Sequence, residues 1–287
     1  MIPKVIAKIL AHFRFLSIVN NSKQGERMFP STSHFFCYRC YNPEKKCFSR
    51  LTGDAPLANM LKKEKGIPLN PEGKELFLKS SERLAAQIRF VLEADKLKKI
   101  LRRSYITDGS RREDDAEHSW HLALMVLILG EYSENPNLNL LRVLGMVIVH
   151  DLVEIDAGDT FVYDTAAIDA KIEKEKQAAD RIFAILPEDQ AQEFRGLWEE
   201  FEAGITAESR FARALDRVQP ILLNWSADGR TWREHGIGFE KVMDLNRPVV
   251  AAGAPGLEQF IIDLLNDAKK RRFFDDTEGE QEHDGES

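Results

Sequence analysis

Residue types that bind divalent metals gather in one part of the chain. His118 is followed 32 residues later by the adjacent pair His150-Asp151, and further carboxylates follow within eight residues, among them Glu154 and Asp159. Imidazole and carboxylate hold Mn, Co, Fe, Zn or Mg while leaving positions open for water and substrate. The cluster therefore predicts a divalent metal site with an acid or base group beside it.

Two apolar helices are expected to bring the histidines together. Asp114 or Asp115 can cap a helix that contains His118, and a second helix is expected over Leu138–His150. A proline and asparagines between them predict a short turn. Because the two helices would then lie side by side and antiparallel, His118 near the first start and His150 near the second end come to the same end of the pair.

A further ligand is expected from Asp216. It lies beside a core-facing stripe at helical spacing, formed by Phe211, Leu215, Val218 and Leu222. A carboxylate at the edge of a buried stripe must be paired or bound to a cation. A salt bridge to Arg213 or Arg217 is the alternative, and the spacing favours neither.

Each of these residues alone has a plainer explanation. A lone histidine such as His118 is more often a core residue with its hydrogen bonds satisfied, and His150-Asp151 alone is a common helix end. Their combination with Asp216 predicts the metal site. His121, one turn after His118, is expected to pack or to support a ligand. The remaining histidines have no such neighbours and no expected catalytic role: His12, His34, His235 and His283.

The pattern resembles the HD superfamily of metal-dependent phosphohydrolases. The branch that it resembles includes the bacterial deoxyribonucleoside 5'-monophosphate nucleotidases and the eukaryotic HD domain-containing protein 2. The motifs that carry the likeness are Arg103, Arg112-Glu113, Glu117-His118-Ser119, His150-Asp151-x-x-Glu154 and Asp216. The likeness covers residues 82–272, and residues 1–80 have no recognised counterpart.

The resemblance implies one divalent metal ion and a set of roles. The metal ligands would be His118, His150, Asp151 and Asp216. Glu154 would position or deprotonate the attacking water, or protonate the leaving oxygen, and Asp159 would lie near the metal-bound water and the sugar.

The resemblance also implies that Arg103 grips the phosphate, whose oxygens match the donor fork of a guanidinium. A solvated helix end is the alternative for Arg103 and for Arg102. Where the nucleotidases have an aromatic residue, this chain has Ser104-Tyr105, which leaves the base or sugar preference open. Two-metal members carry further histidines after the His-Asp pair; this chain offers only His235 and His283 there, which disfavours a two-metal site.

An all-α fold class is predicted for residues 81–272, as a helical bundle. A first helix is expected to end near Arg102-Arg103, and no convincing strand alternation is present. Later helices are expected over Ala166–Leu186, Glu188–Phe201, Glu208–Trp225 and Gly256–Lys270. Residues 1–80 are predicted to be a largely irregular extension, and residues 273–287 a disordered acidic tail.

Composition and charge limit the kinds of partner that the chain is expected to bind. The 287 residues carry a net charge of -7; residues 1–80 hold 14 basic and 6 acidic residues, so the rest holds 26 and 41. An acidic body disfavours nucleic acid. No apolar run is long enough for a membrane helix. Residues 1–19 have amphipathic spacing with basic charges only, for which a targeting or membrane-surface helix is the alternative to chance periodicity.

The three cysteines all lie in the first segment, as Cys37, Cys40 and Cys47. They are too few for a disulfide framework and fit a reducing, cytoplasmic location. Zinc binding together with His34 is the alternative to free thiols.

The predicted function is a metal-dependent phosphohydrolase that releases phosphate from a small phosphomonoester, foremost a nucleoside 5'-monophosphate. A homodimer is expected from the resemblance only. One alternative is a metal-bound nucleotide sensor or partner-binding protein. Another is a phosphodiesterase or triphosphohydrolase with the same site. Trp225 and Trp232 could close over a nucleobase, although packing is the plainer interpretation.

Overall fold

The computed structural model describes residues 80–159, 163 and 168–274. Predictions for residues 1–79, including the three cysteines, and for the acidic tail after residue 274 lie outside the described residues. Phe273 and Phe274 are buried, and Phe274 stacks on Trp232 with ring centroids 4.5 Å apart. The packed domain therefore extends two residues beyond the predicted boundary at 272.

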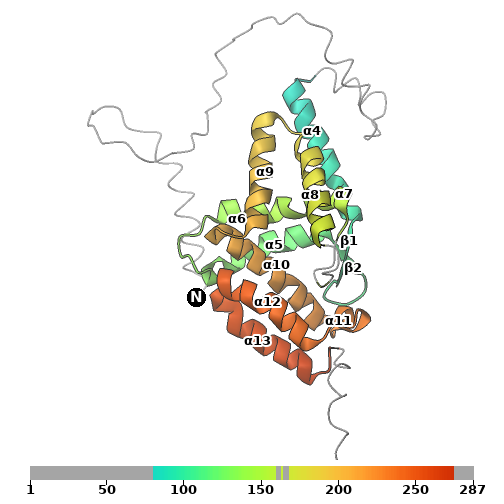
Figure 1. The fold of residues 1–287 in the computed structure, drawn as a ribbon, viewed down its shortest axis with the longest axis vertical. Coiled ribbons are helices and arrows are strands. Elements are labelled where there is room, and N and C mark those ends of the chain that lie inside the picture. The colour runs from blue at the N-terminus through green and yellow to red at the C-terminus, as the bar shows by residue number, and fades with distance from the viewer. Residues whose placement is uncertain (1–79, 160–162, 164–167, 275–287) are drawn as a thin grey trace, which may run out of the picture. The chain divides into compact units, whose positions relative to one another are not determined.

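The described residues are mostly helical, which confirms the all-α prediction (Figure 1). In chain order the helices are α4 (Glu82–Ala94), α5 (Asp115–Leu129), α6 (Leu140–Val149), α7 (Glu154–Ala157), α8 (Ile168–Phe183), α9 (Glu188–Ala203), α10 (Ala207–Ser226), α11 (Arg230–Glu234), α12 (Phe239–Gly253) and α13 (Pro255–Lys270). Short 3-10 helices lie at Asp95–Lys99, Gly130–Tyr132 and His150–Val153. None of the described helices combines the length and apolar character that a membrane crossing requires.

A small antiparallel hairpin corrects the expectation that the domain has no strands. β1 (Leu101–Tyr105) pairs with β2 (Arg112–Asp114), so Arg102 and Arg103 lie on a strand and not at a helix end. The hairpin gave no alternation signal because both strands are short and charged. Gly109, at φ 66°, takes the left-handed backbone conformation that the connecting turn requires.

Helix α5 begins where the sequence places it. Asp114 is the N-cap, and its carboxylate accepts a hydrogen bond from the Glu117 amide at 2.9 Å. The Glu117 carboxylate in turn accepts from the Asp114 amide at 3.2 Å. This reciprocal capping box satisfies two otherwise unpaired donors and fixes the helix start three residues before His118.

Helix α5 is buried on one side only. Leu122, Met125 and Val126 enter the core, but Trp120 and Leu127 on the opposite side are 67% and 61% exposed. An apolar run of eight residues cannot by itself distinguish a buried helix from one that exposes an apolar face. The helix is therefore half in the core.

Helix α10 is the centre of the larger core. It contacts α5, α6, α9, α12 and α13, and Figure 1 shows α10, α12 and α13 stacked side by side. Phe211, Ala214 and Leu215 on α10 are fully buried. A second core cluster beneath α8 and α9 buries Leu152 and Val153, which anchors the turn that carries His150-Asp151.

No helix was expected between Trp225 and Gly256, but α11 and α12 occupy most of this part of the chain. A turn at Asp228-Gly229 precedes α11, with φ values of 54° and 70°. Helix α12 escaped prediction because it contains Pro248 in its interior, and a proline ordinarily ends a helical pattern.

The close packing of α10 against α12 can be tested at Gly253. A Cβ there would lie 2.0 Å from the carbonyl oxygen of Arg210. We expect Gly253→Ala to lower the free energy of unfolding by about 1–3 kcal/mol in urea denaturation, since the two helices must move apart.

The matched control is Gly196→Ala in the middle of α9, where a Cβ meets nothing within 4 Å. This change should raise the free energy of unfolding by about 0.5–1 kcal/mol, because alanine suits a helix interior better than glycine. Equal stability of Gly253→Ala and the wild type would show that the helices do not approach this closely.

Candidate metal centre

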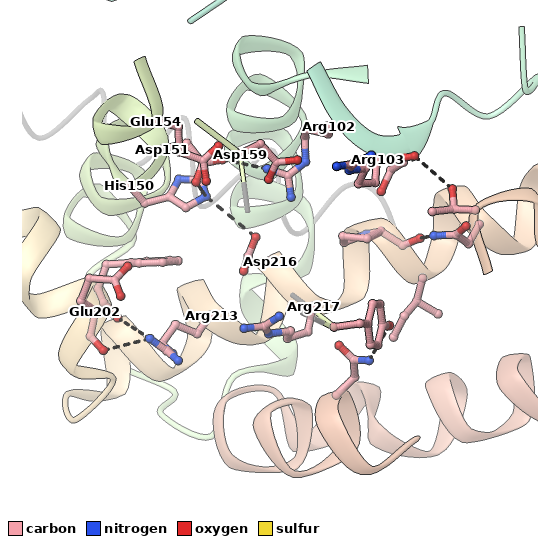
Figure 2. A pocket seen from close by; sticks show the side chains of 18 of the residues that line it. Arg102, Arg103, His150, Asp151, Glu154, Asp159, Glu202, Arg213, Asp216 and Arg217 are labelled. Carbon is pink, nitrogen blue, oxygen red and sulfur yellow. Dashed lines mark hydrogen bonds and ion pairs between the residues drawn. The ribbon is translucent and has the colours of Figure 1, made fainter. Parts of the chain in front are cut away.

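The predicted metal-site residues meet where three elements converge. His118 lies in the first turn of α5, His150 and Asp151 begin the 3-10 helix after α6, and Asp216 lies in the middle of α10. The rings of His118 and His150 have their centroids 5.5 Å apart, so the expected convergence at one end of the helix pair is confirmed. Figure 2 shows Asp216, on α10, directed at His150.

The distances describe a compact set of ligand atoms. Atoms of His118, His150 and Asp151 all lie within 4.8 Å of one another. The two oxygens of Asp151 lie 3.0 Å from His150 Nε2 and 3.9 Å from His118 Nε2. Asp216 Oδ1 lies 3.0 Å from His118 Nε2 and 3.8 Å from His150 Nε2. The two Nε2 atoms therefore share both carboxylates.

The alternative interpretation of Asp216 is not supported. Arg213 donates its hydrogen bonds to the backbone oxygens of Phe201 and Glu202. Among the described residues, Asp216 has no ion pair with Arg213 or Arg217 within 4.0 Å, although the nearby Arg217 charge favours its ionised form. Burial opposes this ionisation, but His118 and Arg217 outweigh it and hold the pKa of Asp216 well below its usual range.

The hydrogen bonds of the two rings fit a metal between them. His118 Nδ1–H donates to Gln219 Oε1 at 3.1 Å, and His150 Nδ1–H donates to the Val147 carbonyl at 3.0 Å. In a neutral imidazole the other nitrogen then carries only a lone pair. Each Nε2 lone pair thus faces carboxylate oxygen 3.0 Å away, a contact of two acceptors that needs a cation.

The pKa values of the two rings agree with the need for a cation between them and the carboxylates. Burial and the charge of Arg102 lower the pKa of His118 to about 4, so this ring is neutral at physiological pH. Burial also disfavours a charged His150, but Asp151 and Asp216 outweigh it and raise its pKa to about 8. Without a metal, a proton on His150 is therefore the cation that the carboxylates attract.

A second carboxylate group lies beside the first. Asp115, Glu154 and Asp159 bring ligand atoms within 4.8 Å of one another. Burial, then the charges of Asp151 and Asp115, raise the pKa of Glu154 far above its ordinary value. Burial and Asp151 raise the pKa of Asp115 to about 7. Glu154 is therefore an uncharged acid at neutral pH, as a proton donor must be.

Sequence reasoning considered Asp115 only as a helix cap. Its spacing of three residues from His118 was the available signal, since residues three apart share a helix face. Asp156, to which no role was assigned, pairs with Arg181 at 2.9 Å away from the ligand set. His121 is half-buried and contacts Gln219 at 3.2 Å, which fits a supporting position.

The two arginines of β1 take different positions. Arg102 is largely buried and its Nη1 lies 3.0 Å from Asp151 and 3.2 Å from Asp115. Arg103 is exposed and lines the cavity, and its backbone oxygen accepts a hydrogen bond from Thr231. Figure 2 shows Arg102 directed at the carboxylates. Neither is a solvated helix end, and Arg102 makes the closer contacts with the cluster.

A cavity of about 330 Å³ opens onto the ligand set. Its walls carry Arg102, Arg103, Arg213, Arg217, Asp151, Glu154, Asp159 and Asp216 together with Tyr163, Asn224, Trp232 and Asn246. Trp232 is 1% exposed and packs on Phe274, so it forms a fixed wall. Trp225 is outside the lining and donates to Asp267, which favours the packing interpretation for it.

Comparisons with known proteins agree with this geometry. The model of the HD domain family matches residues 94–258. A solved structure described as a predicted metal-dependent phosphohydrolase from Magnetospirillum magnetotacticum is 48% identical, with a TM-score of 0.64, and the likeness covers 68% of this chain and 99% of that one.

Curated relatives are named 5'-deoxynucleotidase HDDC2. The Xenopus laevis protein is 31% identical over 136 residues, which are 47% of this chain and 66% of that protein, just under two thirds of its length. The Mus musculus protein is 30% identical over 146 residues, which are 50% of this chain and 71% of that protein. The family model spans more than half of the chain, and the chain therefore belongs to the HD domain family.

Proposed function

We propose that the chain is a metal-dependent phosphoric monoester hydrolase that releases phosphate from nucleoside 5'-monophosphates. The observation that carries the proposal is the pair of imidazoles whose Nε2 atoms converge on Asp151 and Asp216, 3.0 Å from carboxylate oxygen. The names of the similar proteins, 5'-deoxynucleotidase and metal-dependent phosphohydrolase, support the same reaction class.

His118, His150, Asp151 and Asp216 would hold one divalent ion, of which Mn, Co, Mg, Fe and Zn are the candidates. Such an ion lowers the pKa of bound water and offsets charge that develops on the phosphoryl group. The protein's own residues then have to hold the phosphate, place the ester oxygen and supply a proton.

Arg103 would grip the phosphate from the cavity wall, as the family resemblance implies. Its guanidinium offers a fork of donors that matches two phosphate oxygens. Arg102 would act as a second fixed positive charge, because Asp151 and Asp115 hold it in place at 3.0 and 3.2 Å. A charge that is held before the substrate arrives need not reorganise during the reaction.

Glu154 would protonate the leaving ester oxygen. The neighbouring Asp151 and Asp115, together with burial, keep its carboxyl group protonated, and its Oε2 makes no hydrogen bond within the described residues. Asp159 borders the same cavity and is proposed to orient the water and the sugar.

The size of the cavity fits a small substrate. Its volume of about 330 Å³ is in the lower part of the range for small-molecule sites. A nucleoside monophosphate is therefore favoured over a polymer, which agrees with the acidic body of the chain. A homodimer and a cytoplasmic location stay predictions.

Purified protein should release inorganic phosphate from deoxynucleoside 5'-monophosphates with Mn²⁺, Co²⁺ or Mg²⁺ and lose this activity in EDTA. Glu154→Gln should lower kcat by about 10²–10⁴-fold without loss of metal, since it removes the proton donor. Phosphate assays and metal content measure both, with His150→Ala as the blank.

The products separate the alternatives. Release of pyrophosphate or triphosphate, or a monoester left as the end product, would indicate a triphosphohydrolase or a phosphodiesterase. Nucleotide that binds but stays unchanged over long incubation would indicate a sensor. Full turnover by metal-loaded Glu154→Gln would contradict its proposed role.

Substitutions of Arg102 and Arg103 should have different effects on kcat and KM. We expect Arg103→Gln to raise KM by about tenfold or more with unchanged metal affinity, because it removes a substrate contact outside the ligand set. Arg102→Gln should lower kcat without weakening metal binding, because it removes a cation that competes for Asp151. Initial rates and Mn²⁺ titration measure the two effects. A raised KM for Arg102→Gln together with a lowered kcat for Arg103→Gln would show that Arg102 binds the phosphate instead.

Metal affinity should depend on pH through His150. The pKa of this ring is raised to about 8, so below pH 8 the metal must displace a proton. The association constant for Mn²⁺ should therefore fall by about tenfold per pH unit from pH 8 to 6 and level off above pH 8. Calorimetry measures this slope, and His235→Ala, outside the ligand set, should keep it. A constant affinity from pH 6 to 8 would refute the assignment.

A further inference from the structure

Gln219 lies fully buried behind the ligand set. Its Oε1 is 3.1 Å from His118 Nδ1, and its Nε2 is 2.6 Å from Glu113 Oε1 and 3.2 Å from His121 Nδ1. Gln219 and His118 are 0% exposed and Glu113 is 3% exposed. A buried amide with every one of these partners in reach belongs to a connected polar network.

The network admits one orientation of the amide when Glu113 is ionised, the state that its contacts with Arg102 and Gln219 favour. The NH₂ group must face the Glu113 carboxylate, because the carbonyl oxygen there would set two acceptors 2.6 Å apart. The second N–H of the same group then points to His121 Nδ1. The carbonyl oxygen is left for His118, whose Nδ1 must carry the hydrogen.

We propose that Gln219, oriented by Glu113, is a positioning residue that fixes the tautomer of His118 and presents its Nε2 lone pair to the metal. Gln219 follows Asp216 by three residues on α10, so one helix supplies both a proposed ligand and the support of another. The inference rests on the proposed function only in taking His118 as a metal ligand.

Glu113 connects this support to the substrate side of the site. Its second oxygen lies 3.8 Å from Arg102 Nε, and Arg102 in turn contacts Asp151. Strand β2 thus places one carboxylate behind the ligand histidine and the fixed arginine. Burial raises the pKa of Glu113 to about 7, and Arg102 and Gln219 act against this by favouring the ionised carboxylate. This gives the small hairpin a role in the site.

The test uses Co²⁺ alone, followed by its absorption in the visible range. Gln219→Met keeps the length of the side chain but loses the acceptor, and it should weaken Co²⁺ binding by about 10–100-fold, as loss of such supporting contacts does. Gln219→Glu places two carboxylates together and should weaken binding as well. The double substitution Glu113→Gln/Gln219→Glu restores a donor facing an acceptor and should return the affinity to within about threefold of wild type.

Nitrogen-15 NMR of the imidazole rings in the metal-free protein reads the tautomer directly. His118 should carry its hydrogen on Nδ1 in the wild type and in the double variant, and lose that preference in Gln219→Met. Ser209→Ala is the matched control on α10, because Ser209 is equally buried but bonds to Thr206 at the helix start. It should leave Co²⁺ affinity unchanged.

Unchanged Co²⁺ affinity and an unchanged His118 tautomer in Gln219→Met would overturn the inference. Failure of the double substitution to restore affinity would also overturn it, since a merely structural role needs no donor facing an acceptor. If wild-type protein bound no Co²⁺, the proposed function would fail, and the NMR result would still decide the role of Gln219.

Discussion

Two imidazole Nε2 atoms face carboxylate oxygens in a buried space, and the rest of the site follows from this contact. His118 and His150 each donate Nδ1–H to a fixed acceptor, so each Nε2 faces Asp151 or Asp216 at 3.0 Å, and in the metal-free protein the cation there is a proton on His150. Such an arrangement is unfavourable unless positive charge lies between the groups. A divalent ion supplies that charge with ligands that it prefers.

The fold holds these groups in place against their mutual repulsion. The capping box of Asp114 and Glu117 sets the start of α5, and buried Leu152 and Val153 anchor the turn after α6. Helix α10 passes through the core and carries Asp216 at its polar edge. Because the four proposed ligands come from three separately anchored elements, the carboxylates cannot relax apart, and the folded protein still needs a cation between them.

An excess of carboxylates gives the site its acid. Asp151 keeps its charge beside His150 and Arg102, which hold its pKa at about 2 against the effect of burial. Burial and the charges of Asp151 and Asp115 raise the pKa of Glu154, which keeps its proton instead. Two neighbouring carboxyl groups with pKa values pushed apart are what a reaction needs when one must bind a cation and another must donate a proton.

The helices with regular periodicity were predictable, and so was the convergence of His118 with His150, because both follow from local pattern and a short turn. The proposal of Asp216 as a ligand needed the resemblance, since spacing alone did not separate a ligand from a salt bridge. The hairpin was not predictable because its strands are short and charged. The different positions of Arg102 and Arg103 depend on the hairpin and were therefore not predictable either. Glu113 was part of a motif without an assigned role, and its contact with Gln219 was not predictable because the two residues are 106 apart in the chain.

Anomalous diffraction from a crystal grown with Mn²⁺ tests the central claim most directly. We expect one strong peak bounded by His118 Nε2, His150 Nε2, Asp151 and Asp216. A peak among Asp115, Glu154 and Asp159 instead, or no peak near the two histidines, would contradict it.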